Sequence, residues 1–258
     1  MEDFKDRTAL VTGAGRNIGR AIALAFADAG ANVGIIVHSN RSEAESAADE
    51  VRSRGVRSAV AVGDIGDAKA VERMVSEIVG ELGPIDYLVN NAAYRPRQSF
   101  MDISIEDWDQ IIRSNLSSVF YLSRRVLPSM AERGFGRIIN IGGPDGIHGA
   151  LDRAHNVACK SGLIGLTKAI ALEFGEQGIT ANMVIPGSMD TTRNEKDYPG
   201  WEAHVSSLKD LRQKSSLAIP RLGASEEIAW AVMFFASAKS SYVTMQQLYV
   251  AGGLWGLP

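Results

Sequence analysis

The residues with the clearest capacity for chemistry form a glycine-rich turn close to the N-terminus. Positions 13–19 read GAGRNIG, after an apolar run at 8–12 and before an apolar pattern of helical spacing at 18–29. Glycines leave room for a large anion, and the N–H groups and positive dipole end of the following helix attract it. A plain strand-to-helix connection is the alternative, but the order of strand, turn and helix favours a pyrophosphate site. That predicted site comprises Gly13, Gly15, Arg16, Asn17, Ile18 and Gly19.

The end of the second apolar run bears on which dinucleotide would bind. A carboxylate there would accept hydrogen bonds from the adenosine ribose and repel a 2′-phosphate. Positions 38–41 instead read HSNR, and Arg41 joins Arg16 as a second cation. These cations favour NADP over NAD, which stays the alternative, although both could simply lie on a solvated surface. The predicted adenosine end comprises His38, Ser39, Asn40 and Arg41.

A second chemically interesting stretch follows the fifth apolar run, where positions 142–148 read GGPDGIH. His148, with an ordinary pKa of roughly 6.5, could supply a proton if it faces inward. Asp145 could do so if burial raised its pKa, and we place it second. A turn or surface role is the alternative for both. The single cysteine, Cys159, could be a nucleophile but fits a small buried helix residue better, and four scattered histidines give no metal-ligand spacing.

The elements that must position these residues follow from alternating short β-branched runs and longer helical patterns. Strands are predicted at 8–12, 32–37, 57–62, 85–90, 136–141, 180–185 and 247–250. Helices are predicted at 18–29, 42–54, 67–79, 105–133, 150–174 and 225–236. This order predicts an α/β Rossmann fold, a doubly wound seven-stranded parallel sheet with helices on both faces. We expect one dinucleotide-binding domain over 1–258, in which an insertion at 188–220, with Tyr198, Trp201 and His204, covers the substrate.

Several further motifs appear in a fixed order along nearly the whole chain. They are Thr12-Gly13 with Gly19, Asp64-Ile65, Asn90-Asn91-Ala92-Ala93, Pro186-Gly187 and Ala251-Gly252-Gly253. In these motifs the chain resembles the short-chain dehydrogenase/reductase family, particularly its β-ketoacyl-carrier-protein reductase-like members. Asn17 stands where the family has its middle glycine, and asparagine reaches positive φ more readily than most residues. The resemblance implies that Asp64 and Ile65 contact adenine, that Asn91, Ala92 and Ala93 continue the cofactor site, and that Pro186 and Gly187 lie beside the nicotinamide.

The same resemblance implies a catalytic set that this chain only partly retains. In the family a tyrosine moves the proton, a lysine four residues later binds the nicotinamide ribose, a serine orients the carbonyl, and an asparagine supports a proton-relay water. Lys160 and Asn115 match the lysine and the asparagine, whereas Asn156 and Gly143 stand at the tyrosine and serine positions. Asn156 can donate a hydrogen bond to a carbonyl but cannot release a proton at neutral pH. His155, about 100° around the helix from Asn156, should point away from Lys160.

Three functions remain open at this stage. The first is an NADP-dependent oxidoreductase with an altered acid–base site, acting on a small ketone, alcohol or enone. Some enoyl-reducing members of the family also lack the tyrosine, which makes an activated carbon–carbon double bond an option. The alternatives are a catalytically silent sensor or scaffold subunit that binds the cofactor, and a non-redox isomerase or lyase in the same cleft.

The charge and composition of the chain restrict the classes of partner that it could bind. The 27 basic and 30 acidic residues give a net charge of -3 with no like-charge block, which disfavours nucleic acid. No leader-like start and no stretch near the ~20 apolar residues of a membrane span is present, so we expect a cytoplasmic protein with a small-molecule substrate. The resemblance implies a homodimer or homotetramer. Apolar surface for it could come from Trp108, Phe120, Tyr121, Leu163 and Leu166, which could equally cover the sheet.

Overall fold

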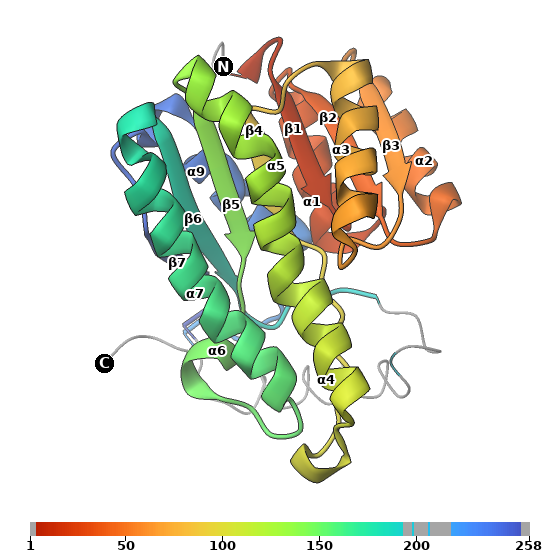
Figure 1. Cartoon of the computed structure of the whole chain (residues 1–258), viewed down its shortest axis with the longest axis vertical. Helices are drawn as coiled ribbons and strands as arrows, with labels where there is room; N and C mark the ends of the chain where they lie inside the picture. The colour runs from red at the N-terminus through yellow and green to blue at the C-terminus, as the bar shows by residue number, and fades with distance from the viewer. Residues whose placement is uncertain (1–3, 193–197, 199–205, 207–217, 254–258) are drawn as a thin grey trace.

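A computed structural model describes residues 4–192, 198, 206 and 218–253 of the chain. Its centre is a parallel sheet of seven strands in the order β3-β2-β1-β4-β5-β6-β7 (Figure 1). The strands are β1 (Thr8–Thr12), β2 (Asn32–Val37), β3 (Ser58–Val62), β4 (Tyr87–Asn90), β5 (Gly136–Ile141), β6 (Ile179–Pro186) and β7 (Gln247–Val250). The predicted fold class is therefore confirmed, and the expected seven strands are all present.

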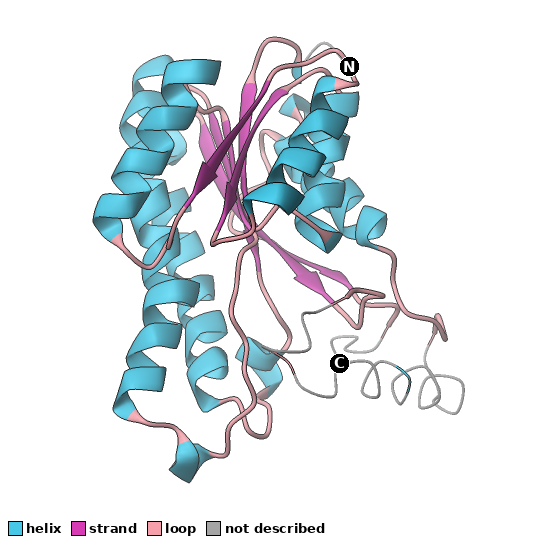
Figure 2. Cartoon of the chain, turned by 90° about the vertical axis from the view of Figure 1, so that its right-hand side faces the viewer, coloured by secondary structure: helices cyan, strands magenta, loops and turns pink. Residues whose placement is uncertain are grey.

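Helices cover both faces of the sheet, as the edge-on view in Figure 2 shows. One layer contains α1 (Asn17–Asp28), α2 (Arg41–Arg52) and α9 (Ser225–Ala236), and their apolar sides share a core with Val11, Ile35 and Val184. The opposite layer contains α3 (Ala68–Leu82), α5 (Ser118–Arg133) and α7 (Ala154–Phe174). Burial on both faces explains why the strands are apolar without strict alternation.

Strand bounds differ from the prediction mainly at β3 and β4, which begin at Ser58 and Tyr87 rather than at 57 and 85. At the start of β4 a side chain adds to the backbone bonds: the Asp86 carboxylate accepts from the Thr8 N–H at 2.9 Å, and the Asp86 N–H donates to the Thr8 carbonyl oxygen at 2.9 Å. Likewise, the Asn32 side-chain oxygen accepts from the Arg57 N–H at 3.0 Å. Neither Asp86 nor Asn32 was used in the sequence analysis to set where a strand begins.

The predicted single helix at 105–133 is wrong, because it is divided into three parts. They are α4 (Ile105–Ile112), a π-helical turn (Arg113–Ser117) and α5. The π turn contains Asn115, and π turns of this kind often occur at functional sites. The predicted helix at 150–174 begins only at Ala154, because Gly149 and Asp152 have φ values of 75° and 58°. The loop expected at 142–148 contains a short helix, α6 (Asp145–His148).

The carboxyl ends of all the strands lie at one edge of the sheet, and α4, α6 and the first turns of α7 extend past it (Figure 1). Most of the predicted substrate-covering insertion at 188–220, including Trp201 and His204, lies outside the described residues. Within the described ranges, no helix has the length and apolar character needed to cross a membrane.

Candidate active site at the carboxyl edge of the sheet

The residues predicted to form the site follow the ends of six different strands. They are the turn after β1, residues 38–41 after β2, 64–65 after β3, 91–93 after β4, 143–148 after β5, and Pro186 with Gly187 at the end of β6. Because all these strands are parallel, their carboxyl ends meet at one edge, where ligands of open α/β sheets bind. The fold thus places them around a common region.

The glycine turn has the backbone shape that a diphosphate requires. Gly13 and Asn17 have φ values of 66° and 49°, so Asn17 adopts the positive φ expected of it. A Cβ on Gly19 would clash with the Gly13 carbonyl oxygen, which leaves only glycine at that position. The residue before α1, Arg16, makes no side-chain capping bond, whereas Asn40 and Asp67 cap α2 and α3. The first N–H groups of α1 are therefore left for a ligand, and the turn fits a pyrophosphate.

The Asn17 side chain also ties this turn to the segment after β6. Its Nδ2 donates to the Thr192 carbonyl oxygen at 2.7 Å, and its Oδ1 accepts from the Thr192 N–H and hydroxyl at 3.1 and 3.2 Å. A glycine at position 17 would keep the backbone shape but lose this link. Sequence reasoning treated Asn17 only as a backbone substitute.

The residues after β4 hold the turn from the other side. The Asn91 Nδ2 donates to the carbonyl oxygens of Thr12 and Gly13 at 2.9 and 3.2 Å. The Thr12 hydroxyl accepts from the N–H groups of Asn91 and Ala92 at 3.0 and 3.1 Å. A Cβ on Gly13 would lie 3.0 Å from the Ala92 Cα, so these two loops are in direct contact. Ala93 follows in the same extended segment.

At the predicted adenosine end, His38, Ser39, Asn40 and Arg41 are all exposed beyond β2. Asn40 caps α2 by accepting a hydrogen bond from the Glu43 N–H at 3.2 Å, and Arg41 lies 3.5 Å from the Glu45 carboxylate. A Cβ on Gly15 would lie 3.3 Å from the Glu43 Cβ, so a carboxylate-bearing side chain borders the turn. Sequence reasoning missed Glu43 because it looked for an acid only at the strand end.

The other two loops predicted to contact the cofactor, after β3 and β6, are held by short contacts. The Asp64 carboxylate accepts from the Gly66 N–H at 2.8 Å, and Ile65 packs partly against the core. After β6, the Gly187 N–H donates to the Val250 carbonyl oxygen at 2.9 Å. A Cβ on Gly187 would lie 2.6 Å from the Ala251 Cα, so the loop after Pro186 lies directly against the chain after β7.

Lys160 projects from α7 into the interior of the site and is only 5% exposed. Its Nζ donates to the Ile141 carbonyl oxygen at 2.8 Å. Burial lowers the pKa of Lys160 to about 7, and the charge of Arg95 acts in the same direction. A Cβ on Gly143 would lie 3.6 Å from the Lys160 Cγ, so the position at which the family has its serine borders the lysine stem.

Asn156 lies one helical turn before Lys160 and is 1% exposed. Its Nδ2 donates to the Asp145 Oδ2 at 3.1 Å, while its Oδ1 has no hydrogen-bond partner among the described residues. Asp145 is also ion-paired with Arg153, whose Nη1 lies 3.0 Å from the same carboxylate oxygen. The structure therefore brings Asn156, Asp145 and Lys160 together.

Asn115 uses its side chain to hold the loop after β4. Its Nδ2 donates to the Tyr94 carbonyl oxygen at 2.7 Å, and its Oδ1 accepts from the Tyr94 N–H at 2.9 Å. This pair of bonds is possible because the π turn widens the helix at Asn115. Asn115 thus fixes the backbone immediately before Arg95.

His148, placed ahead of Asp145 by sequence reasoning, lies exposed at the end of α6. Asp145, at the start of the same helix, makes the direct contact with Asn156. His155 is fully buried, and its Nε2 lies 3.2 Å from the Gln98 Oε1 rather than near Lys160. Burial lowers the pKa of His155, which keeps the ring neutral at neutral pH. The geometry favours Asp145 over either histidine as a neighbour of the reacting atoms.

Cys159 is not a candidate nucleophile. Its side chain is fully buried, and its Sγ lies 3.5 Å from the Ile111 carbonyl oxygen. Burial raises the pKa of the thiol to about 11, so the reactive thiolate is scarce at neutral pH. Nor do three or more His, Cys, Asp or Glu side chains gather as a metal site in the part of the chain that the structure describes.

Two arginines at the cleft were missed by sequence reasoning. Arg95 follows the Asn91–Ala93 segment, and its backbone N–H donates to the Tyr198 hydroxyl at 3.1 Å. Arg153 lies just before α7 and pairs with Asp145. Arg95 comes two residues after the Asn91–Ala93 segment and Arg153 three residues before Asn156, and this closeness to predicted site residues is the signal that could have identified them. Both are partly buried, and this partial burial depends on tertiary contacts that the sequence does not display.

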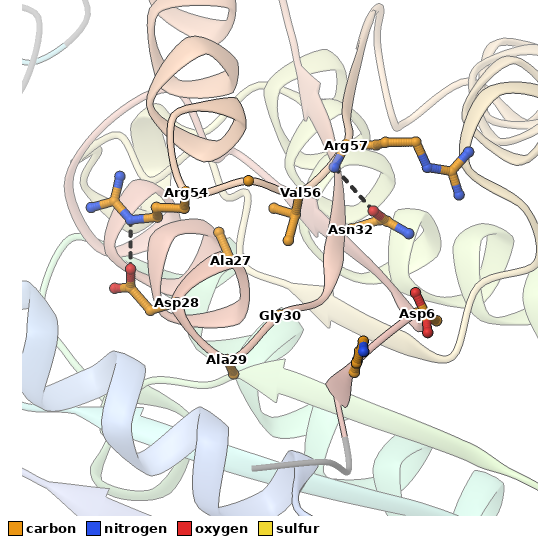
Figure 3. A pocket seen from close by; sticks show the side chains of 11 residues that line it. Asp6, Ala27, Asp28, Ala29, Gly30, Asn32, Arg54, Val56 and Arg57 are labelled. Carbon is orange, nitrogen blue, oxygen red and sulfur yellow. Dashed lines mark hydrogen bonds and ion pairs between the residues drawn. The ribbon is translucent and has the colours of Figure 1, made fainter.

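A surface hollow lies at the opposite, amino-terminal edge of the sheet (Figure 3). Two of its arginines have local partners: the Arg54 Nε lies 2.7 Å from the Asp28 carboxylate, and the Arg57 guanidinium donates to the carbonyl oxygens of Glu81 and Leu82. None of the predicted site residues lines it. We therefore place the chemistry at the carboxyl edge.

Comparison with known proteins gives matches along almost the whole chain. Residues 13–255 match the family model described as enoyl-(acyl carrier protein) reductase. Nodulation protein G of Azospirillum brasilense is 38% identical over 253 residues, 97% of this chain and 99% of that protein. The 3-oxoacyl-[acyl-carrier-protein] reductase FabG of Escherichia coli (strain K12) is 38% identical over 256 residues, 98% of this chain and 99% of that protein. The enzyme of the same name from Staphylococcus aureus (strain N315) is 36% identical over 249 residues, 96% and 98% of the two chains.

Proposed function

This chain belongs to the short-chain dehydrogenase/reductase family of oxidoreductases, and from that premise we propose that it is an NADP(H)-dependent enzyme whose proton donor is Lys160. Its substrate is a small carbonyl compound, the corresponding alcohol, or an activated alkene. The names of the FabG relatives support a carbonyl, while the description of the matched family model supports an alkene. The observation that carries the proposal is the buried Lys160 amine beside Gly143 and Asn156.

The cofactor would be held by the residues along the carboxyl edge. When bound, NADPH supplies the hydride that reduces the substrate carbon. The N–H groups at the start of α1 bind its diphosphate, and Arg16 and Arg41 pair with its 2′-phosphate. Lys160 binds the nicotinamide ribose, and Pro186 and Gly187 line the nicotinamide ring. The lack of a capping side chain at Arg16 and the steric requirement for glycine at position 19 support this assignment.

Lys160 is suited to proton transfer because its pKa is lowered to about 7. A general acid works best when its pKa lies near the working pH. An ammonium group has three N–H donors, of which one is used by the Ile141 carbonyl oxygen. The others are available to the ribose and to the substrate oxygen. In carbonyl reduction Lys160 gives its proton to that oxygen and is reprotonated from water, so each turnover consumes one NADPH and one proton.

Asn156 and Asp145 act as positioning groups in this scheme. The Asp145 carboxylate fixes the Asn156 amide through the hydrogen bond of 3.1 Å. An amide cannot donate a proton at neutral pH, but it can orient a substrate that Lys160 protonates. Asn115 keeps the opposite wall in place through its two bonds to Tyr94.

The test is to load the protein with NADPH and follow nicotinamide absorbance with a panel of ketones, aldehydes and enones across a range of pH. We expect turnover whose rate constant for reduction falls as pH rises through about 7, where Lys160 loses its proton. Turnover that does not change through this pH range would remove Lys160 as the acid. If none of the panel were reduced, the proposal of a redox enzyme would give way to the alternative below.

The second candidate is a silent sensor or scaffold subunit that binds the cofactor. It is favoured by the simultaneous lack of a tyrosine at Asn156 and a serine at Gly143. A silent subunit would bind NADPH with the same loops but never oxidise it. Lys160 would then serve the ribose alone, and its substitution would change cofactor affinity without any change in turnover.

We further propose that the segment 188–220 covers the substrate. Two of its residues support this: Thr192 is bonded to Asn17 of the cofactor turn, and the Tyr198 hydroxyl accepts from the Arg95 N–H. Both contacts join the segment to the two sides of the site. Protection of this segment from proteolysis on addition of NADPH would support the proposal, and unchanged cleavage would contradict it.

The chain is also proposed to be a homodimer or homotetramer. Phe120 on α5 is 46% exposed and Leu172 on α7 is 72% exposed, which leaves apolar side chains on the outer helical layer. Leu163, which sequence reasoning considered as contact surface, is only 1% exposed and belongs to the chain's own core. Light scattering should give a mass of two or four chains, and a monomer would contradict the proposal.

A further inference from the structure

The cleft contains an unusual concentration of positive charge. Arg95 lies close enough to both Lys160 and Arg153 for its charge to interact with theirs, and Asp145 is the carboxylate near all three among the described residues. Asp145 is already engaged, by Arg153 at 3.0 Å and by Asn156 at 3.1 Å. Among the residues that the structure describes, Arg95 therefore has no ion pair.

The backbone of Arg95 is held in place, but the hydrogen-bond donors of its guanidinium are not all used. Its guanidinium makes no hydrogen bond to any residue that the structure describes, and its Nε is shielded from solvent. Its backbone, by contrast, is fixed by the bond to the Tyr198 hydroxyl and by the neighbouring Tyr94–Asn115 pair. Burial lowers the pKa of Arg95, although an arginine keeps its proton in proteins. A shielded cation with unused donors is costly unless an anion pairs with it.

An anion bound by Arg95 would be distinct from the phosphates of the cofactor. The diphosphate site lies at the start of α1, where Gly13 contacts Ala92. Arg95 lies further along the loop, where its charge acts on Lys160 and is itself influenced by Asp145 and Arg153. This is the substrate side of the proposed hydride-transfer site. The Arg153 Nε, also shielded and without a partner in the described part of the chain, lies on the same side.

We propose that the substrate carries a carboxylate and that Arg95 binds it. This inference rests on the proposed function, because it assigns the substrate class of the same site: a small oxo acid, hydroxy acid or unsaturated acid. The planar guanidinium offers two parallel N–H donors that match the two oxygens of a carboxylate. With the carboxylate on Arg95, the carbonyl of the same molecule lies on the side of Lys160 and Asn156.

The experiment is calorimetric titration of the full chain, saturated with NADP⁺ and also without it, with oxamate. Oxamide, which has nearly the same shape but no charge, is the control ligand, and inorganic phosphate is a second anion. The variants are Arg95→Gln, which removes the charge, and Arg95→Lys, which keeps the charge but loses the planar pair of donors. Arg97→Gln is the matched control, because Arg97 is an exposed arginine two residues away.

We expect oxamate to bind the unmodified chain and Arg97→Gln alike, and oxamide to bind neither. Arg95→Gln should weaken oxamate binding about tenfold or more, and Arg95→Lys should have a smaller effect. Arg95→Gln should also melt at the same or a higher temperature than the unmodified chain, because it removes an unpaired charge. A lower melting temperature would show that Arg95 has a structural partner and would overturn the inference.

Other outcomes are equally decisive. Equal binding of oxamide and oxamate, tighter binding of phosphate than of oxamate, no binding of oxamate, or unchanged affinity in Arg95→Gln would each overturn the carboxylate assignment. Calorimetry does not depend on turnover. A chain that binds oxamate through Arg95 but never oxidises NADPH would therefore uphold this inference and reject the proposed function, and the opposite pair of results would do the reverse.

Discussion

The glycine turn and the region around Lys160, where we propose proton transfer, lie along the same edge of one sheet, yet they are built from different kinds of contact. The turn is defined by backbone shape: the φ values of Gly13 and Asn17 and the lack of a Cβ at Gly19. The region around Lys160 is defined by side chains, and we propose that Asn156 and Gly143 there stand at the positions of the family's tyrosine and serine.

This difference explains which region tolerates substitution. Asn17 reaches the positive φ that a glycine would provide and in addition bonds to Thr192. An acid–base group has no such freedom, because an amide cannot replace a phenol as a proton donor. Loss of the tyrosine therefore requires a new donor or the end of catalysis, and Lys160 is the donor that we propose.

The largest expected effect comes from Lys160→Ala. We expect kcat/KM to fall by about 10²–10⁴, because the variant loses the general acid, and NADPH affinity to fall as well. Steady-state kinetics and fluorescence titration measure the two effects. Lys168→Ala, an exposed lysine on the same helix, is the control and should behave as the unmodified chain. Unchanged kinetics in Lys160→Ala would show that the cleft has another acid.

Arg16→Glu combined with Arg41→Asp tests the cofactor side. The change should weaken NADPH about 10–100-fold and leave NADH nearly unaffected, because charge-assisted bonds to the 2′-phosphate are lost and acids are introduced. Titrations with both nucleotides give the ratio, and Lys239→Glu, at an exposed lysine after α9, is the control. An unchanged ratio would reject the charge argument for NADP.

Gly19→Ala tests the backbone requirement of the turn. The added Cβ meets the Gly13 carbonyl oxygen, so the variant should lose about 1–3 kcal/mol of unfolding free energy as well as NADPH affinity. Gly80→Ala is the matched control: this exposed helix glycine has nothing near its Cβ position, and the substitution should stabilise by about 0.5–1 kcal/mol. Urea unfolding measures both. Equal effects at the two glycines would contradict the steric account.

The smallest expected effect, taken over one pH unit, is the dependence of stability on pH. Lys160 has a pKa of about 7 in the folded chain against an ordinary value of 10.5, so between these values the unfolded chain binds more protons. The unfolding free energy should therefore rise with pH over this range, by at most about 1.4 kcal/mol per pH unit from this group. Lys160→Met should remove that part of the slope in urea unfolding of the cofactor-free protein. An identical slope in the variant would place the Lys160 pKa near its ordinary value.

Sequence patterns were sufficient to predict the sheet and the glycine turn, because strands and glycine turns depend mainly on residues that are close in sequence. The bounds of β1, β2, β5 and β7 agree with the prediction, and Asn17 has the expected φ. The π turn at Asn115 was not predictable from apolar spacing, since the periodicity continues across it. The contact of Asp145 with Asn156 and the burial of Arg95 arise from the packing of α6 and the β4 loop against α7, which no local signal encodes.

The most direct test of the central claim is a fluorescence titration of the purified chain with NADPH and, separately, with NADH. We expect NADPH to bind saturably, and clearly more tightly than NADH, because Arg16 and Arg41 pair with the 2′-phosphate that only NADPH carries. If neither nucleotide bound, the assignment of the glycine turn would be contradicted, and with it the function proposed for the region around Lys160.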